Sequence, residues 1–298
     1  MGDVGSPLLQ ASEASVSKDS LEAARALATS SGRRVDTPVR KSFVRPMIEA
    51  AGPKAPLAQI YSGGRGGTVA VKVFLALLWK CSAAPFCTDK PARAWATLLD
   101  LDDPTGLGAR RVKDALRTLE RAKLIEMKPQ PGLPNLVTLR DESGLGIDYE
   151  APSTAYSKAQ RFRAKQPVLA SNTYFKVPRG LWTTGYIQKL SGPALVMLLI
   201  LLAEQAGTGG EVWFSTEEFP RRYNVSHKTR AAGTKELIKK GLLTVESRSL
   251  AAWSGASVFD TQRYRKVYRL TPLAQATPAE PLPSPARPPR PPVTDPDR

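Results

Sequence analysis

The 298-residue chain is poor in side chains that bind metals or cross-link folds: it contains one histidine, His227, and two cysteines, Cys81 and Cys87. Two thiols in a chain of this length indicate a reducing compartment rather than a disulfide scaffold. Three such side chains do not complete a four-ligand zinc site, and a single histidine excludes strand-nicking enzymes that hold a metal with paired histidines. We therefore expect no metal and no other cofactor.

Long apolar runs are missing as well. The longest, residues 193–203, has about half the length that a membrane-spanning helix needs, so it predicts a buried helix instead. Residues 1–20 are polar and small and lack the apolar core of a secretory signal peptide. These two absences favour a cytoplasmic protein without a membrane partner, associated with the nucleoid if it binds DNA.

Acidic residues are scarce. The chain has 43 Lys and Arg against 27 Asp and Glu, a net charge of +16, and no acidic residue between Ala151 and Ala203. Such a basic chain favours a polyanionic partner, namely DNA, RNA or an anionic membrane. The alternative is a soluble basic protein without such a partner, and clustering of the charge argues against it.

A repeated pattern stands beside these absences. Residues 109–127 and 227–245 each contain a cationic helix, a short break and a β-prone stretch, and an offset of 118 aligns Leu119 with Leu237. A recognition helix followed by a wing has this order in a winged helix-turn-helix. Two copies in one chain therefore make binding to duplex DNA the leading hypothesis.

The spacing of apolar residues predicts further helices and strands around each copy, so that each copy belongs to a domain. For residues 67–142 we expect three helices and a β-hairpin, at 69–81, 90–101, 108–122, 124–128 and 136–140. For residues 172–274 we expect a lead-in strand, three helices and two strands, at 174–178, 193–204, 216–223, 227–240, 242–247 and 263–270. The predicted fold class is α+β, mainly helical, with two winged helix-turn-helix domains.

Three further segments complete the expected organisation. Residues 1–66 are predicted to be a flexible basic arm or solvated linker, within which Ser17 is placed to cap a short helix through Ala28. Residues 143–171 are predicted to be a basic linker. Residues 275–298 are predicted to be a disordered tail, because nine prolines between positions 277 and 298 prevent a packed core.

The candidate DNA-contacting side chains lie on the two basic helices and on the second wing. They are Arg110, Arg111, Lys113, Arg117, His227, Lys228, Thr229, Arg230, Lys235, Arg263 and Arg265. The first residues of each helix are expected to meet base edges, with Arg230 a particular candidate, and later cations are expected to meet phosphates. A solvated cationic face is the alternative for one helix alone, and its recurrence in the same context favours DNA.

Catalytic patterns are weak. His227 and Arg230 form an H-x-x-R string, as in tyrosine recombinases, but the rest of that constellation is not visible beside Tyr264 or Tyr268. The glycine-rich residues 61–68 lack the lysine of a phosphate-binding loop and are expected to form a hinge. No serine, histidine and aspartate arrangement stands out, so we expect no enzyme.

The stretches LERAKLIEM, from Leu119, and LIKKGLLTV, from Leu237, resemble the recognition-helix ends of bacterial winged helix-turn-helix proteins. The tandem arrangement, YFKVP at 174–178 and the proline-rich tail resemble actinobacterial plasmid or phage proteins, among them replication initiators with two winged-helix domains. The resemblance implies sequence-specific binding to duplex DNA, as a replication initiator or as a transcriptional regulator. The long arms and the lack of a ligand domain depart from compact regulators and leave both roles open.

A hypothesis of another class is a protein-interaction scaffold. One winged helix would then mediate dimerisation, and the tail would bind a protein partner. The expected partners are accordingly double-stranded DNA, a second copy of the chain, and a protein that takes the proline-rich tail.

Overall fold

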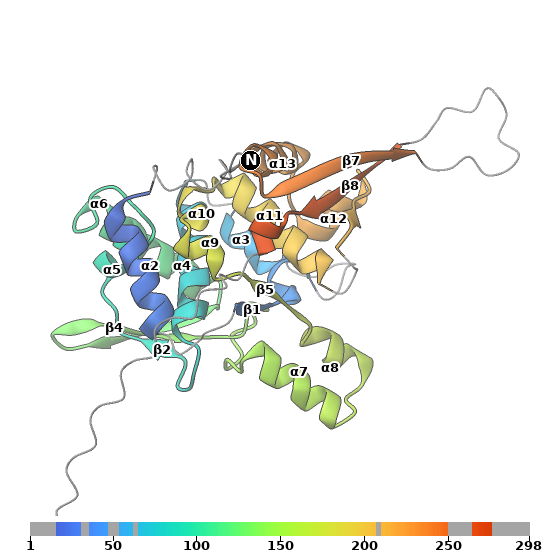
Figure 1. Ribbon diagram of the computed structural model, residues 1–298. Helices are drawn as coiled ribbons and strands as arrows, with labels where there is room; N and C mark the ends of the chain where they lie inside the picture. The colour runs from blue at the N-terminus through green and yellow to red at the C-terminus, as the bar shows by residue number, and fades with distance from the viewer. Residues whose placement is uncertain are drawn as a thin grey trace, which may run out of the picture.

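The computed structural model describes residues 16–30, 36–46, 54–61, 65–206, 210–249 and 264–275. These residues form an α+β structure in which helices predominate and the strands make three small antiparallel sheets. In Figure 1 the central helices form a body from which a long two-stranded ribbon and a pair of helices project in different directions. No helix in this part of the chain is both long enough and apolar enough to cross a membrane.

Residues 65–139, the first unit, contain three helices and three strands. These are α4 (Arg65–Lys80), β2 (Cys87–Thr88), α5 (Ala92–Leu98), α6 (Leu107–Arg121), β3 (Ile125–Gln130) and β4 (Leu133–Leu139). The strand order is β2-β4-β3. The inward face predicted for the third helix is confirmed, because its apolar positions are all buried in α6, namely Val112, Ala115, Leu116 and Leu119.

Residues 192–270, the second unit, follow the same order of elements. They are α11 (Gly192–Gln205), β6 (Val212–Trp213), α12 (Glu218–Tyr223), α13 (His227–Lys239), β7 (Leu243–Ser249) and β8 (Tyr264–Leu270). The strand order β6-β8-β7 corresponds to that of the first unit. The sequence repeat is therefore a repeat of topology: helix, strand, two helices, then two strands, with the last strand in the centre of the sheet.

Local signals explain where the helices of the second unit begin and end. Ser191 caps the apolar helix α11 by accepting a hydrogen bond from the backbone N–H of Ala194, and Ser226 caps α13 in the same way through Thr229. Gly241 follows α13 with φ of 70°, a left-handed conformation that glycine adopts at little cost. These predicted caps are confirmed.

The expectation of a flexible arm over residues 1–66 is wrong for its described segments. They form α2 (Lys18–Ser30), β1 (Thr37–Arg40), the 3-10 turn η1 (Lys41–Phe43) and α3 (Pro56–Tyr61). The predicted cap is correct, since the Ser20 N–H donates to Ser17 Oγ at 3.3 Å. Arg40 lies within the predicted basic arm, but it is 3% exposed and forms a salt bridge with Glu142, which is fully buried.

The segment between the two units is also folded. The predicted linker contains α7 (Pro152–Arg161) and α8 (Gln166–Ser171), which we call the α7–α8 pair. The predicted lead-in strand is confirmed as β5 (Tyr174–Val177), and it pairs with β1 rather than with either unit's sheet. Two short helices, α9 (Gly180–Thr183) and α10 (Tyr186–Lys189), then lead into α11, and α14 (Pro272–Gln275) follows β8.

The glycine-rich segment before the first unit differs from the predicted hinge. Helix α4 already begins at Arg65, so Thr68 lies inside the helix and does not cap it. Gly67 sits against the end of α3, where an added Cβ would lie 2.5 Å from the carbonyl oxygen of Tyr61. A glycine is therefore required for this close approach, and residues 62–64 of the predicted hinge lie outside the described residues.

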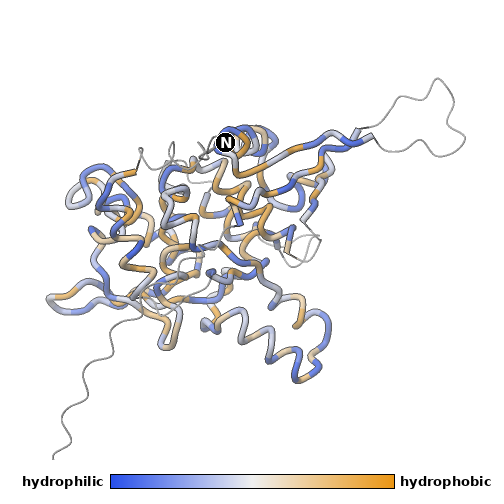
Figure 2. Tube along the Cα trace, viewed as in Figure 1, coloured by the Kyte–Doolittle hydropathy of each residue, from blue (hydrophilic) through white to orange (hydrophobic). Residues whose placement is uncertain are grey.

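One hydrophobic core joins the two units. It contains ten of the sixteen residues of α4 and ten of the fourteen residues of α11, and it includes Trp79 stacked on Trp182 of α9 at 5.5 Å between ring centroids. Figure 2 shows the most apolar segments concentrated in these central helices, with hydrophilic segments around them. The relative position of the units is consequently set by buried side chains and not by a linker.

Candidate nucleic-acid interface

The basic face of α6 begins at a well-defined helix start. The Asp103 carboxylate accepts hydrogen bonds from the N–H groups of Leu107, at 2.8 Å, and Gly106, at 3.1 Å. These two bonds hold the pKa of Asp103 below its ordinary value. The first turn is thereby closed, and the next residues, Arg110, Arg111 and Lys113, are all exposed.

Most acidic side chains near this face are already engaged. Asp114 pairs with Arg117 at 2.8 Å, and Glu120 accepts the backbone N–H of Met127 in β3 at 3.0 Å. In contrast, Arg110, Arg111 and Lys113 form no salt bridge with any residue that the structure describes. The outer face of α6 therefore presents three uncompensated cations, with Arg117 exposed but paired beside them.

Helix α13 carries one acidic residue, Glu236, and the structure turns it inward. Its Oε1 accepts the backbone N–H of Ser191 at 3.0 Å, and its Oε2 accepts the Ser191 hydroxyl. Glu236 thus helps to cap α11, where a negative charge is favourable. The predicted residues His227, Lys228 and Lys235 are exposed, so the outer face of α13 is cationic.

Arg230 is placed differently from the prediction. Its guanidinium lies within 6 Å of three aromatic ring centroids, at 4.8 Å from Phe219, 5.3 Å from Phe214 and 5.5 Å from Tyr268. Its Nη2 also donates to the Tyr268 hydroxyl at 2.9 Å. A guanidinium held by these contacts stabilises the second unit and is not extended towards a partner.

The repeat itself contained the signal for this placement. The offset of 118 that aligns Leu237 with Leu119 also aligns Arg230 with Val112, since 230 − 118 = 112. Val112 is fully buried on the inner face of α6. The equivalent position of α13 therefore also faces inward, although the sequence does not reveal that aromatic rings receive it.

Thr229 and the second wing complete the predicted set. Thr229 is half-buried and its hydroxyl lies 3.0 Å from that of Ser226, so it belongs to the cap of α13. Arg265 stacks on Trp213 with its guanidinium carbon 3.7 Å from the ring centroid. Arg263 lies outside the described residues. The exposed helix cations, rather than the wing, are the clearest features of the site.

Other wing cations are neutralised within the chain. Glu211 accepts Arg248 in a bidentate pair, at 2.7 and 2.8 Å, and also pairs with Arg269. Hydrogen bonds from these two arginines lower the pKa of Glu211. Since Arg248 of β7 and Arg269 of β8 both pair with Glu211, the described part of the wing carries less free charge than its sequence indicates.

A buried lysine lies between the two basic helices. Lys72 of α4 donates to the carbonyl oxygen of Gln188 at 2.8 Å, and burial lowers its pKa to about 8. It interacts electrostatically with Glu236 of α13 and Arg111 of α6. Both helices are therefore close to one charged group of the shared core.

The structure adds no support for a tyrosine nucleophile at Tyr268 or for a metal site. Tyr268 is buried and its hydroxyl is bonded to Arg230, which is not the accessible position that a strand-cleaving nucleophile needs. Within the described ranges, no three His, Cys, Asp or Glu side chains gather as metal ligands.

Comparison of the chain with protein-family models, with curated proteins and with solved structures finds no match.

Proposed function

We propose that this chain is a sequence-specific double-stranded DNA-binding protein with two winged helix-turn-helix domains. The observation that carries the proposal is that one order of elements occurs twice, and that the same helix of each unit turns cations outward. On this reading α5 with α6, and α12 with α13, are the helix-turn-helix pairs, and the β3–β4 and β7–β8 hairpins are the wings. Helices α6 and α13 would then enter the major groove.

Both helices carry cations that no acidic group of the described residues neutralises, and this supports a polyanionic partner. Exposed cations without an ion pair in the described chain stand on both helices and include Arg110, Arg111, Lys113, Lys228, Lys235 and Lys239. If these six side chains each neutralise one phosphate, the logarithm of the affinity falls against the logarithm of salt concentration with a slope of about −5. Glu236, by contrast, is withdrawn from this surface to cap α11.

Arginine and lysine give the two helices different tasks in this proposal. Arg110 and Arg111 open α6, and an arginine can donate two parallel hydrogen bonds to the O6 and N7 atoms of guanine. On α13 the free cations are lysines, which suit phosphates. The first unit is therefore proposed to supply more base recognition, and the second more phosphate contact.

The biological role follows from the site that the chain selects. Selection of bound fragments from genomic DNA should enrich a defined sequence. A repeated site would support initiation of replication, whereas a promoter palindrome would support regulation of transcription. If no fragment is enriched, the DNA proposal fails and the scaffold hypothesis takes its place.

A direct test compares charge removal on and off the two helices. Arg110→Ala/Lys113→Ala and Lys228→Ala/Lys235→Ala should each reduce the salt slope by about 2, since each removes two of the six cations on which the expected slope is based. The matched control is Lys18→Ala/Arg25→Ala, which removes two exposed charges from α2. A control that weakens binding as much as the helix variants would show that only net charge matters.

A further inference from the structure

The α7–α8 pair projects from the body as a separate surface. Helix α7 is anchored by three buried residues, Pro152, Ala155 and Ala159, whereas α8 has no buried residue. Phe162, which follows α7, is 71% exposed. Figure 1 shows the pair on the side of the body opposite α13, so it is remote from the surface proposed for duplex DNA.

This surface carries cations without matching acids. No Asp or Glu occurs between Ala151 and Ala203. The exposed cations are Lys158, Arg161, Arg163, Lys165 and Lys176. Lys158 pairs with Glu150 at 3.7 Å across an exposed contact, and the other four form no salt bridge with the described residues. An exposed salt bridge of this kind contributes little to stability, so Lys158 can exchange Glu150 for another partner.

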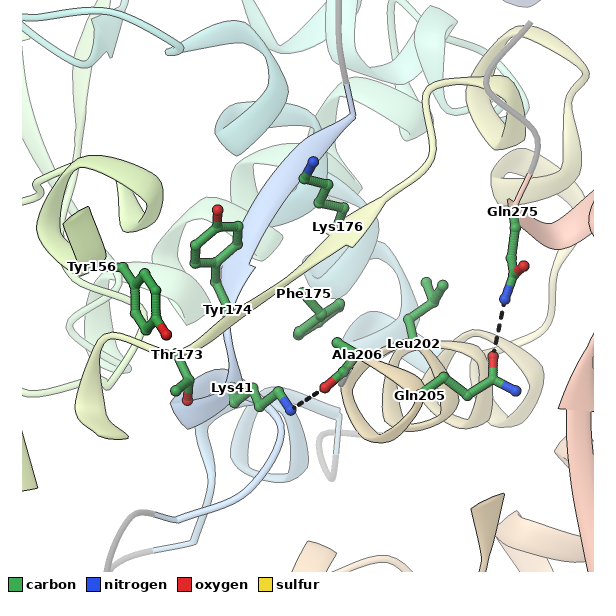
Figure 3. A pocket seen from close by; sticks show the side chains of 10 residues that line it. All are labelled: Lys41, Tyr156, Thr173, Tyr174, Phe175, Lys176, Leu202, Gln205, Ala206 and Gln275. Carbon is green, nitrogen blue, oxygen red and sulfur yellow. Dashed lines mark hydrogen bonds between the residues drawn. The ribbon is translucent and has the colours of Figure 1, made fainter. Parts of the chain in front are cut away.

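Aromatic rings lie among these cations. Tyr156 of α7 and Tyr174 of β5 meet edge to face with ring centroids 6.0 Å apart. Figure 3 shows the two rings side by side at one edge of a pocket of about 530 Å³ that Lys41 and Lys176 also line. Lys41 Nζ donates to the carbonyl oxygen of Ala206 at 2.9 Å, a bond between two residues that line the pocket.

A second hollow runs along α7 beside Phe162. It has a volume of about 580 Å³ and combines hydroxyls, cations and one exposed ring, namely Ser153, Thr154, Ser157, Lys158, Arg161 and Phe162. Hydroxyls and cations suit phosphate and base edges, and the ring suits a base face. Each of the two hollows therefore combines hydroxyls, cations and an aromatic ring, and the two have no lining residue in common.

We propose that this surface binds single-stranded nucleic acid, with bases stacked on Tyr156, Phe162 and Tyr174 and phosphates held by Arg161 and Lys176. Aromatic rings set in a cationic groove are the means by which proteins hold unpaired strands, because every base offers a face for stacking. A duplex offers phosphates here but keeps its base faces covered. The surface shares no residue with α6 or α13, so this site is independent of the function proposed above.

The test measures binding of the full chain to fluorescein-labelled oligothymidine and to a duplex of equal length, by fluorescence anisotropy at one salt concentration. Tyr156→Ala/Phe162→Ala should weaken oligothymidine binding by about tenfold or more, the loss expected from two stacking partners. Duplex binding should change less than about twofold. Phe162→Trp should retain oligothymidine binding, since the ring is kept.

The matched control is Val168→Ala, which removes an apolar side chain of α8 that is 50% exposed but has no ring. It should bind oligothymidine like the parent. Circular dichroism of each variant verifies the fold, and Arg161→Ala provides a second, purely electrostatic variant that should also weaken oligothymidine binding.

Three outcomes would overturn the proposal: no binding of oligothymidine by the parent, equal loss of duplex and oligothymidine in the double variant, or displacement of oligothymidine by polyglutamate at the same charge concentration. The last result would assign the surface to an acidic protein. An oligouridine arm distinguishes RNA from DNA as the source of the strand, and tighter binding of either polymer supports a single-strand site.

Discussion

The two units share a topology but hold their basic helices in different ways. Helix α6 buries an apolar stripe, including Val112 and Leu119, whereas α13 buries only Gly233 and Leu237. The second helix compensates with a close backbone approach and with the bond between Glu236 and Ser191. Equivalent positions in a repeat therefore need not be stabilised by equivalent forces.

The difference extends to the charges that each helix offers. Residues 221–240 have a sequence net charge of +6 against +4 for residues 105–128, which predicts a stronger phosphate contribution from the second unit. However, Arg230 is enclosed by aromatic rings and Arg221 pairs with Glu218 at 2.7 Å. The advantage of the second unit is smaller in the structure than in the sequence.

The largest expected effects come from the one apolar position that both helices use alike. Leu119→Ala and Leu237→Ala should each destabilise the protein by about 2–5 kcal/mol, because both side chains are fully buried and each change leaves a cavity. Thermal unfolding of the two variants measures this. A variant that melts like the parent would show that its helix does not pack as described.

A second experiment exchanges the residues at one aligned position, Gly233 of α13 and Ala115 of α6. Gly233→Ala should cost about 1–3 kcal/mol, since the new Cβ would lie 2.3 Å from the carbonyl oxygen of Pro193. Alanine is the better helix former, so propensity alone predicts the opposite sign. Denaturant unfolding of the variant measures whether stability falls, as the close contact predicts, or rises, as helix propensity predicts.

Ala115→Gly is the matched control for this exchange. It should cost about 1 kcal/mol through the lower helix propensity of glycine. A stabilising Gly233→Ala would remove the proposed distinction between the two helix contacts.

Substitutions of Arg230 and Lys228 distinguish residues of α13 that stabilise the fold from residues that are proposed to bind DNA. Arg230→Ala should destabilise the second unit by about 1–2 kcal/mol, because it removes the contacts with the rings and with the Tyr268 hydroxyl. Lys228→Ala should leave thermal unfolding unchanged and lower the salt slope of DNA binding by about 1. Loss of DNA binding by Arg230→Ala without any loss of stability would return Arg230 to the contact surface.

The smallest expected effect comes from a difference between the two central helices, α4 and α11. Buried Lys72 belongs to α4, whereas α11 has no charged residue before Glu204. Because the folded-state pKa of Lys72 lies below its ordinary value, the unfolded chain binds more protons between pH of about 8 and 10.5, and stability should rise with pH in that window. The expected slope is at most about 1 kcal/mol per pH unit.

Lys72→Met isolates this effect from the titration of other groups. The difference in unfolding free energy between the parent and Lys72→Met should change across the window, with the parent gaining stability relative to the variant as pH rises. A constant difference would show that Lys72 titrates in the folded protein as it does in water.

Much of the helical structure could be predicted from local patterns. The apolar run of α11, the spacing of Val112 and Leu119, and the caps at Ser17, Ser191 and Ser226 act within a few residues, so the sequence displays them directly. Strands β2 and β6 have two residues each and show no such pattern. Strand β1 was missed because its partner, β5, lies more than a hundred residues away.

The sequence by itself determined the repeat, the faces of its long helices and the excess of positive charge, because periodicity and composition are local properties. Only the tertiary structure decided which charges remain free. It enclosed Arg230 among rings, used Glu236 to cap α11, buried Arg40 beside Glu142 and set Tyr156 beside Tyr174. The physical reason is that a charged or aromatic side chain takes its role from the groups around it, which come from distant parts of the chain.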